Sequence, residues 1–334
     1  MAERAVPWVE KYRPRTVTDV AHQTEVVDTL RKAVETRNLP HLIFYGPPGT
    51  GKTSTILACA RDLYGSDFKK RVLELNASDE RGISIVRNKI KSFAMVAVNA
   101  KTNAEGQSIP PYKLIVLDEA DSMTTDAQSA LRRTMETYCR ITRFCIICNY
   151  VSRLIPPITS RCAKFHFKPL PKQATLDRLK MIAAAEGVGC SDRVFALIEE
   201  QSEGDMRKAI QMMQSLHRLA MDGEIAEQAV LDISGAVPAE TVRALIAGCQ
   251  QPNAFKQIQA EVDALLLQGY PAGQLLAQLS GEVVSSATLP DVAKGVISKG
   301  LAEADKHLVD GANEYLQLLN VFAIICRSAA PAAA

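Results

Sequence analysis

The chain has 334 residues, of which 47% are hydrophobic and 23% charged, a composition typical of a globular protein of two or three domains. Its formal net charge is only +2, so binding to a polyanion would depend on a local basic patch rather than on the field of the whole chain. No apolar run reaches the ~18 residues that a membrane span needs, and aromatic residues make up only 5%, which disfavours a wide base-stacking platform.

Short apolar runs recur through the first half of the chain and predict strands. Several are nearly continuous apolar stretches, as expected for strands that are covered on both faces. Helical patterns lie between them, and strands that alternate with helices predict an α/β fold with a parallel, doubly wound, five-stranded sheet. The predicted strands are residues 41–45, 71–75, 113–117, 143–149 and 163–167. The polar, breaker-rich stretch 99–111 predicts an exposed loop.

After about residue 171 the strand patterns stop and amphipathic helices follow. Gly235 and Pro238 interrupt this helical region. We therefore expect an α/β domain followed by a small helical domain and a helical C-terminal domain. The predicted boundaries are 1–170, 171–236 and 237–328, with an Ala-rich disordered tail at 329–334.

A phosphate-binding motif follows the first predicted strand. The stretch "GPPGTGKT" matches G-x-x-x-x-G-K-[ST] in full and opens a helix, as that motif requires. Its glycines allow backbone N–H groups to cradle phosphate oxygens, and Lys52 supplies a compact positive charge near them. The Thr53 hydroxyl is a candidate ligand for Mg²⁺. The predicted ATP-binding residues here are Gly46, Pro47, Pro48, Gly49, Thr50, Gly51, Lys52, Thr53 and Ser54.

The run "LIVLDEAD" supplies two carboxylates at the end of a predicted strand. Ligands of open α/β sheets bind at the carboxyl ends of the strands, so Asp118 can hold Mg²⁺ and Glu119 can polarise an attacking water. The letters "DEAD" also suggest a DEAD-box helicase. However, the chain lacks the phosphate-loop pattern typical of those helicases, and its downstream helices do not predict a second ATPase domain of their kind.

A set of motifs, taken in order, resembles the small subunits of the replication factor C clamp loader, which are AAA+ ATPases. The motifs are "WVEKYRP", "FYGPPGTGKTS", "LNASDERG", "LDEADSMT", "ALRRTME", "CNYVSRLIPPITSRC", "FKPL" and "EGDMRKAI". The resemblance extends from Trp8 to about residue 235 and more loosely to the end. It implies an AAA+ ATPase domain, a helical lid domain and a helical collar domain for oligomerisation.

The same resemblance implies further site residues. Tyr12, Arg13 and Pro14 match a segment that lies against the adenine, Asn149 matches sensor one, and Arg207 matches sensor two on a lid helix.

Arg161, in "SRC", matches an arginine finger that acts on the nucleotide of the neighbouring subunit. Without the resemblance, Arg161 would be interpreted as one partner of a buried ion pair.

Basic residues cluster after "SDERG". Arg81, Arg87, Lys89 and Lys91 fall within eleven residues, and the pattern is helical from Ile83 onward. One face of this helix would be cationic, and the family places helices of this region along duplex phosphates, so the cluster predicts sequence-independent DNA binding. A solvated basic face is the alternative. The apolar residues at 92–98 follow, where the family faces the clamp, but core packing explains each of them equally well.

Eight cysteines are present, and several lie in apolar runs, which predicts a reducing compartment without disulfides. Cys145 and Cys148 form C-x2-C, yet residues three apart on a strand point to opposite faces and cannot converge on zinc. We therefore expect no metal other than Mg²⁺.

The resemblance implies an ATP- and Mg²⁺-dependent, nuclear subunit of a hetero-pentamer of replication factor C subunits. It would open the sliding clamp PCNA and place it on primer–template DNA, with no membrane partner. Two alternatives stay open: another AAA+ machine, such as an initiator or helicase loader, and a scaffold subunit with little turnover of its own.

Overall fold

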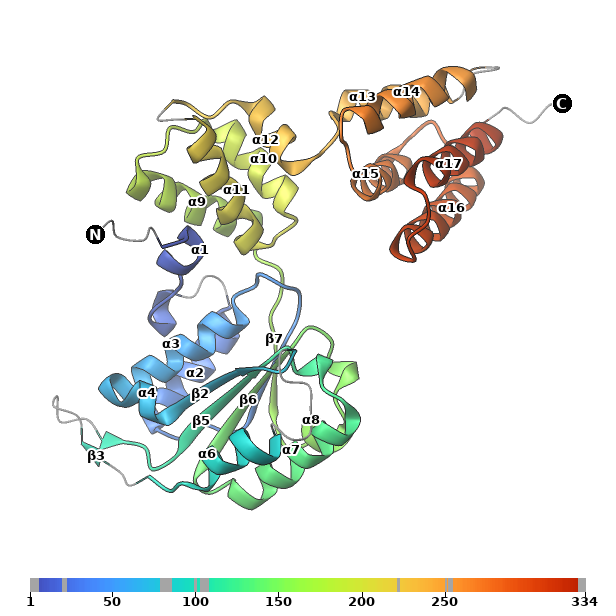
Figure 1. Cartoon of the computed structure of the whole chain (residues 1–334). Helices are drawn as coiled ribbons and strands as arrows, with labels where there is room; N and C mark the ends of the chain where they lie inside the picture. Colours follow the sequence, from blue (N-terminus) through green and yellow to red (C-terminus); the bar gives the residue numbers. More distant parts are fainter. Residues whose placement is uncertain are drawn as a thin grey trace. The chain divides into compact units, whose positions relative to one another are not determined.

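The structure, a computed structural model, describes residues 6–19, 23–78, 86–98, 101–102, 108–220, 223–249, 251 and 255–329 (Figure 1). The chain divides into two compact units, residues 1–214 and 215–334. The predicted three-domain boundaries stay a prediction. Residues 330–334 of the predicted tail lie outside the described residues, and Ala329 is the last residue of a helix.

A five-stranded parallel sheet forms the centre of the first unit, which confirms the predicted fold class. The strand order is β2-β5-β6-β1-β7. Each predicted strand is present with its ends within about one residue of the expected positions. Their bounds are β1 Leu42–Tyr45, β2 Val72–Asn76, β5 Lys113–Asp118, β6 Thr142–Cys148 and β7 Ala163–His166.

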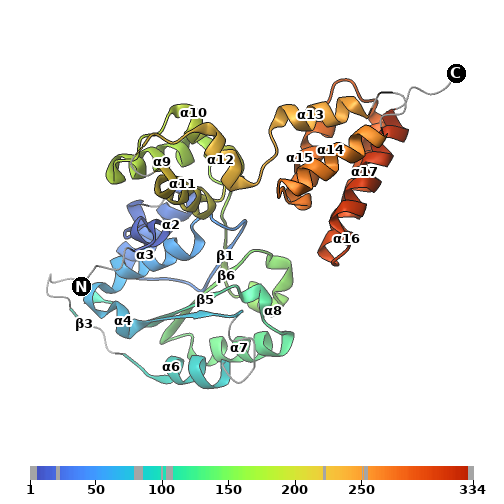
Figure 2. The same ribbon diagram turned by 45° about the horizontal axis from the view of Figure 1, so that its top comes forward.

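Helices cover both faces of this sheet, which explains why the strands are apolar throughout. Leu42 and Phe44 of β1 pack with residues of α2 (Thr24–Thr36) and α3 (Lys52–Tyr64). Ile43, between them, belongs to the opposite core with α7 (Thr125–Tyr138) and α8 (Pro156–Thr159). Figures 1 and 2 show these two helical layers on either side of the sheet.

The stretch predicted as an exposed loop is partly ordered into a hairpin. β3 (Lys101–Thr102) pairs antiparallel with β4 (Ser108–Ile109), and Ile109 is only 2% exposed because it joins the core beside α3. Strands of two residues carry no periodicity, so composition alone led to the wrong expectation here.

Short helical segments and three longer helices complete the first unit, and the longer ones confirm the helical patterns predicted after residue 171. The short segments are α1 Trp8–Lys11, η1 Val17–Asp19, η2 Gly65–Asp67, α4 Phe68–Arg71, η3 Val86–Ile90, α6 Lys91–Met95, η4 Ala120–Ser122 and η5 Val151–Arg153. The longer ones are α9 Lys172–Glu186, α10 Asp192–Ser202 and the start of α11 Met206–Ala220.

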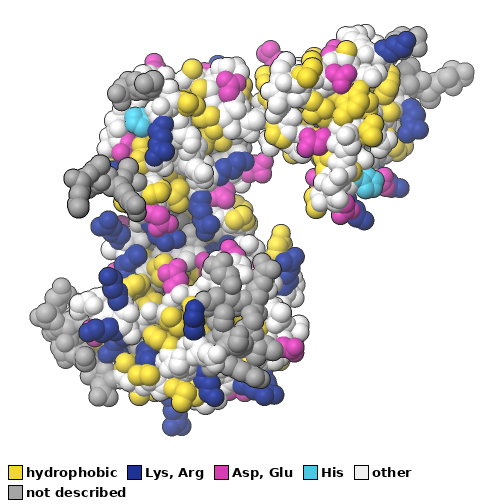
Figure 3. Space-filling model, in the orientation of Figure 1, with side chains coloured by type: hydrophobic (Ala, Val, Ile, Leu, Met, Phe, Trp, Pro, Cys, Tyr) yellow, Lys and Arg dark blue, Asp and Glu magenta, His cyan; other side chains and the backbone are white. Residues whose placement is uncertain are grey.

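All the regular elements in the described part of the second unit are helices. Apart from the end of α11 it contains α12 Glu227–Ser234, α13 Ala239–Gly248, α14 Phe255–Leu267, α15 Ala272–Ser285, α16 Asp291–Val309 and α17 Glu314–Ala329. Helices α13 to α17 share one apolar core. Apolar side chains also gather on the visible surface of this unit (Figure 3), and Leu267, Val292 and Val309 are each more than four-fifths exposed, at 88%, 81% and 82%. In the described part of the chain, no helix is both long enough and apolar enough to cross a membrane.

Candidate nucleotide site

The phosphate loop joins β1 to α3 at the carboxyl edge of the sheet, and two glycines in it are required by close contacts. A Cβ on Gly46, at φ +142°, would lie 2.2 Å from the carbonyl oxygen of Phe167. A Cβ on Gly49, at φ +71°, would lie 1.9 Å from Oδ1 of Asp205. Only glycine therefore allows the loop to pass this close to β7 and to the start of α11.

Lys52 is held beneath the loop as the first residue of α3. Its ammonium donates hydrogen bonds to the carbonyl oxygens of Gly46 (2.8 Å) and Pro47 (2.7 Å) and to Oδ1 of Asn149 (3.1 Å). Burial lowers the pKa of Lys52, and the nearby Asp118 carboxylate opposes that shift. The ammonium thus lies beside the N-terminus of a helix, where backbone N–H groups favour a phosphate.

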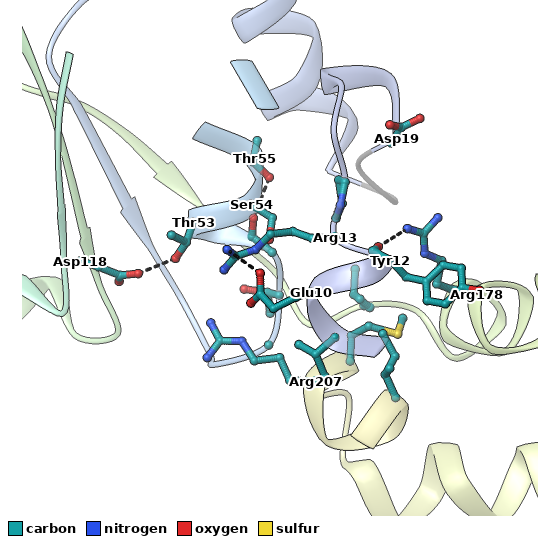
Figure 4. A pocket seen from close by; sticks show the side chains of 18 of the residues that line it. Glu10, Tyr12, Arg13, Asp19, Thr53, Ser54, Thr55, Asp118, Arg178 and Arg207 are labelled. Carbon is teal, nitrogen blue, oxygen red and sulfur yellow. Dashed lines mark hydrogen bonds and ion pairs between the residues drawn. The ribbon is translucent and has the colours of Figure 1, made fainter. Parts of the chain in front are cut away.

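Two oxygen ligands suited to Mg²⁺ meet at this edge. The Thr53 hydroxyl donates a 2.6 Å hydrogen bond to Oδ2 of Asp118 (Figure 4). Hydroxyl and carboxylate oxygens are the donors that this hard cation prefers. The pair therefore fits the predicted metal site, with one residue from α3 and the other from the end of β5.

Glu119 has a left-handed backbone conformation, with φ 53° and ψ 38°. Its amide donates to Oδ1 of Asp118 (2.9 Å), while its carbonyl accepts the hydroxyl and the amide of Ser122 (2.7 and 3.0 Å). A non-glycine residue held in this region is strained, and such strain concentrates at functional sites. The neighbouring contacts thus fix the position from which the Glu119 carboxylate projects.

Asn149 directly follows β6, one residue beyond the strand in which the sequence placed it, and Asp121 positions it. Oδ2 of Asp121 accepts the amides of Asn149 (3.2 Å) and Tyr150 (3.3 Å). The Asn149 side chain is then directed to Lys52. Asp121, the last residue of "DEAD", is thus a site residue that was not predicted from the sequence.

A cavity of about 320 Å³ opens beside the loop, which is within the size range of ligand sites. Predicted residues from distant parts of the chain line it: Tyr12, Arg13, Pro14, Gly49, Thr50, Gly51, Thr53, Ser54, Asp118, Glu119 and Arg207. Figure 4 shows Arg13 and Arg207 projecting into this space from the N-terminal segment and from α11. Gly46, Pro47, Pro48, Lys52 and Asn149 are not among the lining residues that the structure describes; Lys52 is buried, whereas Pro47, Pro48 and Asn149 are exposed outside the cavity.

The cavity also has lining residues that the sequence analysis did not assign to the site. They are Val9, Glu10, Asp19, Thr55, Glu74, Asn76, Leu170, Arg178, Met206 and Ile210. Asn76 could have been found, because a parallel sheet gathers the carboxyl ends of its strands at one edge, and the structure pairs Asn76 with Asp118 there. Arg178 could not, because nothing local in α9 distinguishes it from other surface arginines.

Arg161 lies outside this lining, two residues after the end of α8. Nη2 of Arg161 is 2.7 Å from Oε1 of Glu136, and Nη1 donates to the Pro157 carbonyl at 2.6 Å. The two charged side chains are 40% and 38% exposed. The ion pair is therefore on the surface, not buried as the sequence without the resemblance would have suggested.

The basic cluster is described only in part. Arg81 lies outside the described residues, and so does the side chain of Arg87, whose backbone forms part of a π-helical turn, Val86–Ile90. Lys89 and Lys91 are exposed, whereas Ile90 is buried against the sheet. A π-helical turn is wider than an α-helical turn, so the α-helical spacing behind the predicted cationic face does not apply to Val86–Ile90.

The end of this helix is attached to the sheet. Nζ of Lys113 donates to the Phe93 carbonyl (2.7 Å), and the Thr142 hydroxyl donates to the Ala94 carbonyl (3.2 Å). Met95 is 54% exposed. The cationic helix is thus anchored to the first residues of β5 and β6.

The cysteines behave as apolar core residues. Cys145 belongs to the core on the α3 side of the sheet and Cys148 to the core on the α7 side, so the two thiols point to opposite faces as predicted. Burial raises the pKa of Cys148 to about 12, which disfavours the thiolate that metal binding requires.

The fold and the site define an AAA ATPase. The family model for ATPases associated with various cellular activities matches residues 42–170. Solved structures of RuvB from Thermotoga maritima share the fold; one, described as a Holliday junction branch migration motor, has a TM-score of 0.52 at 16% identity over 75% of this chain and 85% of that one.

The C-terminal unit narrows the identification. The replication factor C C-terminal domain model matches residues 237–323. The chain is 52% identical to replication factor C subunit 4 of Homo sapiens, over 96% of this chain and 88% of the human protein. It is 52% identical to subunit 2 of Oryza sativa (94% and 92% covered) and 44% identical to the small subunit of Archaeoglobus fulgidus (93% and 94%). The chain therefore belongs to the replication factor C family, as its motifs predicted.

Proposed function

We propose that this chain is an ATP-binding and ATP-hydrolysing subunit of a sliding-clamp loader. The complex would open PCNA and place it on primer–template DNA during replication and repair in the nucleus. Family membership supports the proposal. The observation that carries it is that the phosphate loop, the Thr53–Asp118 pair, Glu119 and Arg207 are assembled around a single cavity.

Each residue of the site has a separate role in the transfer of the γ-phosphoryl group to water. Lys52 and the first amides of α3 bind the phosphates. To do so, Lys52 must replace its hydrogen bonds to the loop carbonyls with hydrogen bonds to phosphate oxygens. Thr53 and Asp118 would hold Mg²⁺, which neutralises phosphate charge when bound. Glu119 accepts a proton from the attacking water, and Asn149 orients that water or the γ-phosphate.

The remaining contacts come from outside the sheet. Arg207 reaches the phosphates from α11, and Tyr12, Arg13 and Pro14 flank the base. Arg161 lies apart from this cavity and serves the nucleotide of a neighbouring subunit, where a guanidinium stabilises charge on the γ-phosphate. To do so it must leave Glu136.

Charged and exposed apolar side chains indicate which surfaces would contact DNA and other subunits. Lys89 and Lys91, with Arg81 and Arg87, would contact duplex phosphates without reading bases. The exposed apolar side chains of the second unit are suited to packing against other replication factor C subunits in a hetero-pentamer. A membrane plays no part in this assembly.

Two alternatives are less well supported. An initiator or helicase loader with a winged-helix domain would need strands in the C-terminal unit, and the described residues there are helical. A scaffold subunit without turnover would not need Glu119 fixed in a strained conformation beside the Mg²⁺ residues.

Two substitutions test the site in the assembled complex. Lys52→Ala should weaken equilibrium binding of ATP, because the phosphates lose their point charge. Glu119→Gln should keep ATP bound and slow its hydrolysis, because the phosphate and Mg²⁺ contacts survive. Equal ATP affinity in Lys52→Ala and the unmodified chain would refute the site, whereas unchanged turnover in Glu119→Gln would leave the scaffold alternative standing.

A further inference from the structure

The N-terminal segment 8–17, which we call the strap, connects two parts of the first unit. At one end it contacts helices α9 and α11, and at the other it contacts α3, the helix that begins with Lys52. Five residues of the strap also line one wall of the nucleotide cavity: Val9, Glu10, Tyr12, Arg13 and Pro14.

The end of the strap at α9 and α11 is held by four hydrogen-bonding contacts. The Trp8 amide donates to Oε1 of Gln214 (3.2 Å), and Trp8 itself is only 7% exposed. Nη2 of Arg178 donates to the Tyr12 carbonyl (2.7 Å). Oε1 of Glu186 accepts both the Tyr12 hydroxyl and the Lys11 ammonium, each at 2.6 Å.

At the α3 end, side chains of α3 contact backbone atoms of the strap. Nη1 of Arg61 lies 3.5 Å from the Pro14 carbonyl, and the Val17 amide donates to Oδ2 of Asp62 at 3.0 Å. Val17 is 4% exposed and packs in the core that α2 and α3 share. The strap is thus fixed at both ends. Its partners in α9 and α11 lie 160 or more residues further along the sequence.

The strap cannot hold this conformation by itself. Its helix, α1, spans four residues, far fewer than an isolated helix needs to persist in water. Its shape over the cavity is therefore imposed by its partners. Glu186 is the one carboxylate among the contacts with α9 and α11 given above, its side chain is 17% exposed, and bonds to a charged acceptor are roughly twice as strong as neutral ones.

We infer that Glu186, assisted by Arg178, is a positioning residue that clasps the strap to α9 and thereby sets the affinity of the cavity for a nucleoside triphosphate. Glu186 does not line the cavity and acts through Tyr12 and Lys11. Because the strap is also tied to α3, the clasp links helices α9 and α11 to the helix that carries the phosphate-binding residues. This inference rests on the proposed function only in the identity of the ligand.

The clasp consists of the contacts that Glu186 and Arg178 make with Lys11 and Tyr12. The chain contains a single tryptophan, Trp8, and it lies in the strap, so its fluorescence emission reports directly whether the strap is held in place. In the full chain without nucleotide, Glu186→Ala should increase acrylamide quenching of Trp8 and shift its emission to the red. Glu186→Gln retains an acceptor but no charge and should lie between Glu186→Ala and the unmodified chain. Tyr12→Phe removes one bond only and supplies a second variant should Glu186→Ala fail to fold.

Nucleotide binding supplies the second readout. Glu186→Ala should weaken ATP binding by about tenfold, as expected for loss of charge-assisted bonds. In the assembled complex, turnover at saturating ATP should stay within about twofold, because no group that touches the reacting atoms has changed. If the role of Glu186 were merely structural, Glu186→Ala would lower the melting temperature and would reduce ATP affinity and turnover together.

Glu200→Ala is a matched control, since Glu200 is an exposed glutamate on the neighbouring helix α10. The clasp is refuted if Trp8 quenching and ATP affinity in Glu186→Ala match those of the unmodified chain, or if Glu200→Ala changes them equally. If the unmodified chain binds no ATP while the Trp8 readout behaves as expected, the proposed function fails and the clasp survives.

Discussion

Replacement of Arg161 by alanine distinguishes a role at the neighbouring subunit's nucleotide from a structural role. The structure predicts a small effect on stability, whereas loss of an arginine finger would have a large effect on the rate of hydrolysis. The ion pair with Glu136 is about 40% exposed on both sides. Such pairs contribute ~0.2–1 kcal/mol. For a unit of this size the loss corresponds to a fall in melting temperature of at most ~4 °C. An arginine finger, in contrast, is worth ~10³ or more in rate.

The assay uses a complex in which only this subunit carries Arg161→Ala. Its own ATP affinity should be unchanged, its melt should fall by no more than those few degrees, and turnover with clamp and DNA should be depressed at the neighbouring site. Glu136→Gln is the matched control, since it breaks the same ion pair and keeps the guanidinium, so turnover should survive. A large fall in melting temperature, or unchanged turnover in a fully assembled Arg161→Ala complex, would overturn the reasoning.

Three further outcomes are expected. Burial lowers the pKa of His41 to about 4 from 6.5, so the stability that its neutral form contributes is complete above pH 6.5 and is lost as the pH falls toward 4; urea unfolding at pH 7 and pH 5 should show a smaller pH dependence in His41→Asn. Neutralising Arg87 and Lys91 should flatten the salt dependence of DNA binding by about one unit per lost phosphate contact, equally for duplexes of different sequence. Gly49→Ala should weaken ATP binding, because the new methyl group would displace the Asp205 side chain that caps α11.

Each of these has a contradicting result. Equal pH dependence in His41→Asn would show that the imidazole titrates normally, and unequal losses on two duplexes would show that bases are read. Gly269→Ala controls for backbone strain alone, because Gly269 has φ +87° and no atom lies within 4 Å of the added Cβ. If Gly49→Ala binds ATP as that control does, the contact with Asp205 is unimportant.

The sequence was sufficient to predict the sheet and the position of the candidate phosphate loop between β1 and α3. Strands covered on both faces, such as Lys113–Asp118, are continuous apolar runs that end at recognisable breaks. The phosphate loop combines fixed glycines, a lysine and a threonine whose roles follow from chemistry alone. Asp118 and Glu119 could be placed because a parallel sheet collects its strand ends at one edge.

The remainder depends on contacts between distant residues or on local irregularity. Glu186 lies 174 positions from Tyr12, and no periodicity in α9 predicts that pairing. The π-helical turn at Val86–Ile90 departs from the α-helical spacing on which a shared face was predicted. The hairpin of β3 and β4 is too short to have a pattern, and the burial of Ile109 results from the core it joins.

Whether the nucleotide site of this chain is used in clamp loading is measured most directly by the rate at which a reconstituted complex places a fluorescently labelled clamp on primer–template DNA. Complexes would differ only in this subunit, carrying either the unmodified chain or Lys52→Ala, and assembly would be verified for both. We expect ATP-dependent loading with the unmodified chain and a severe loss with Lys52→Ala. Equal loading rates from two fully assembled complexes would contradict it.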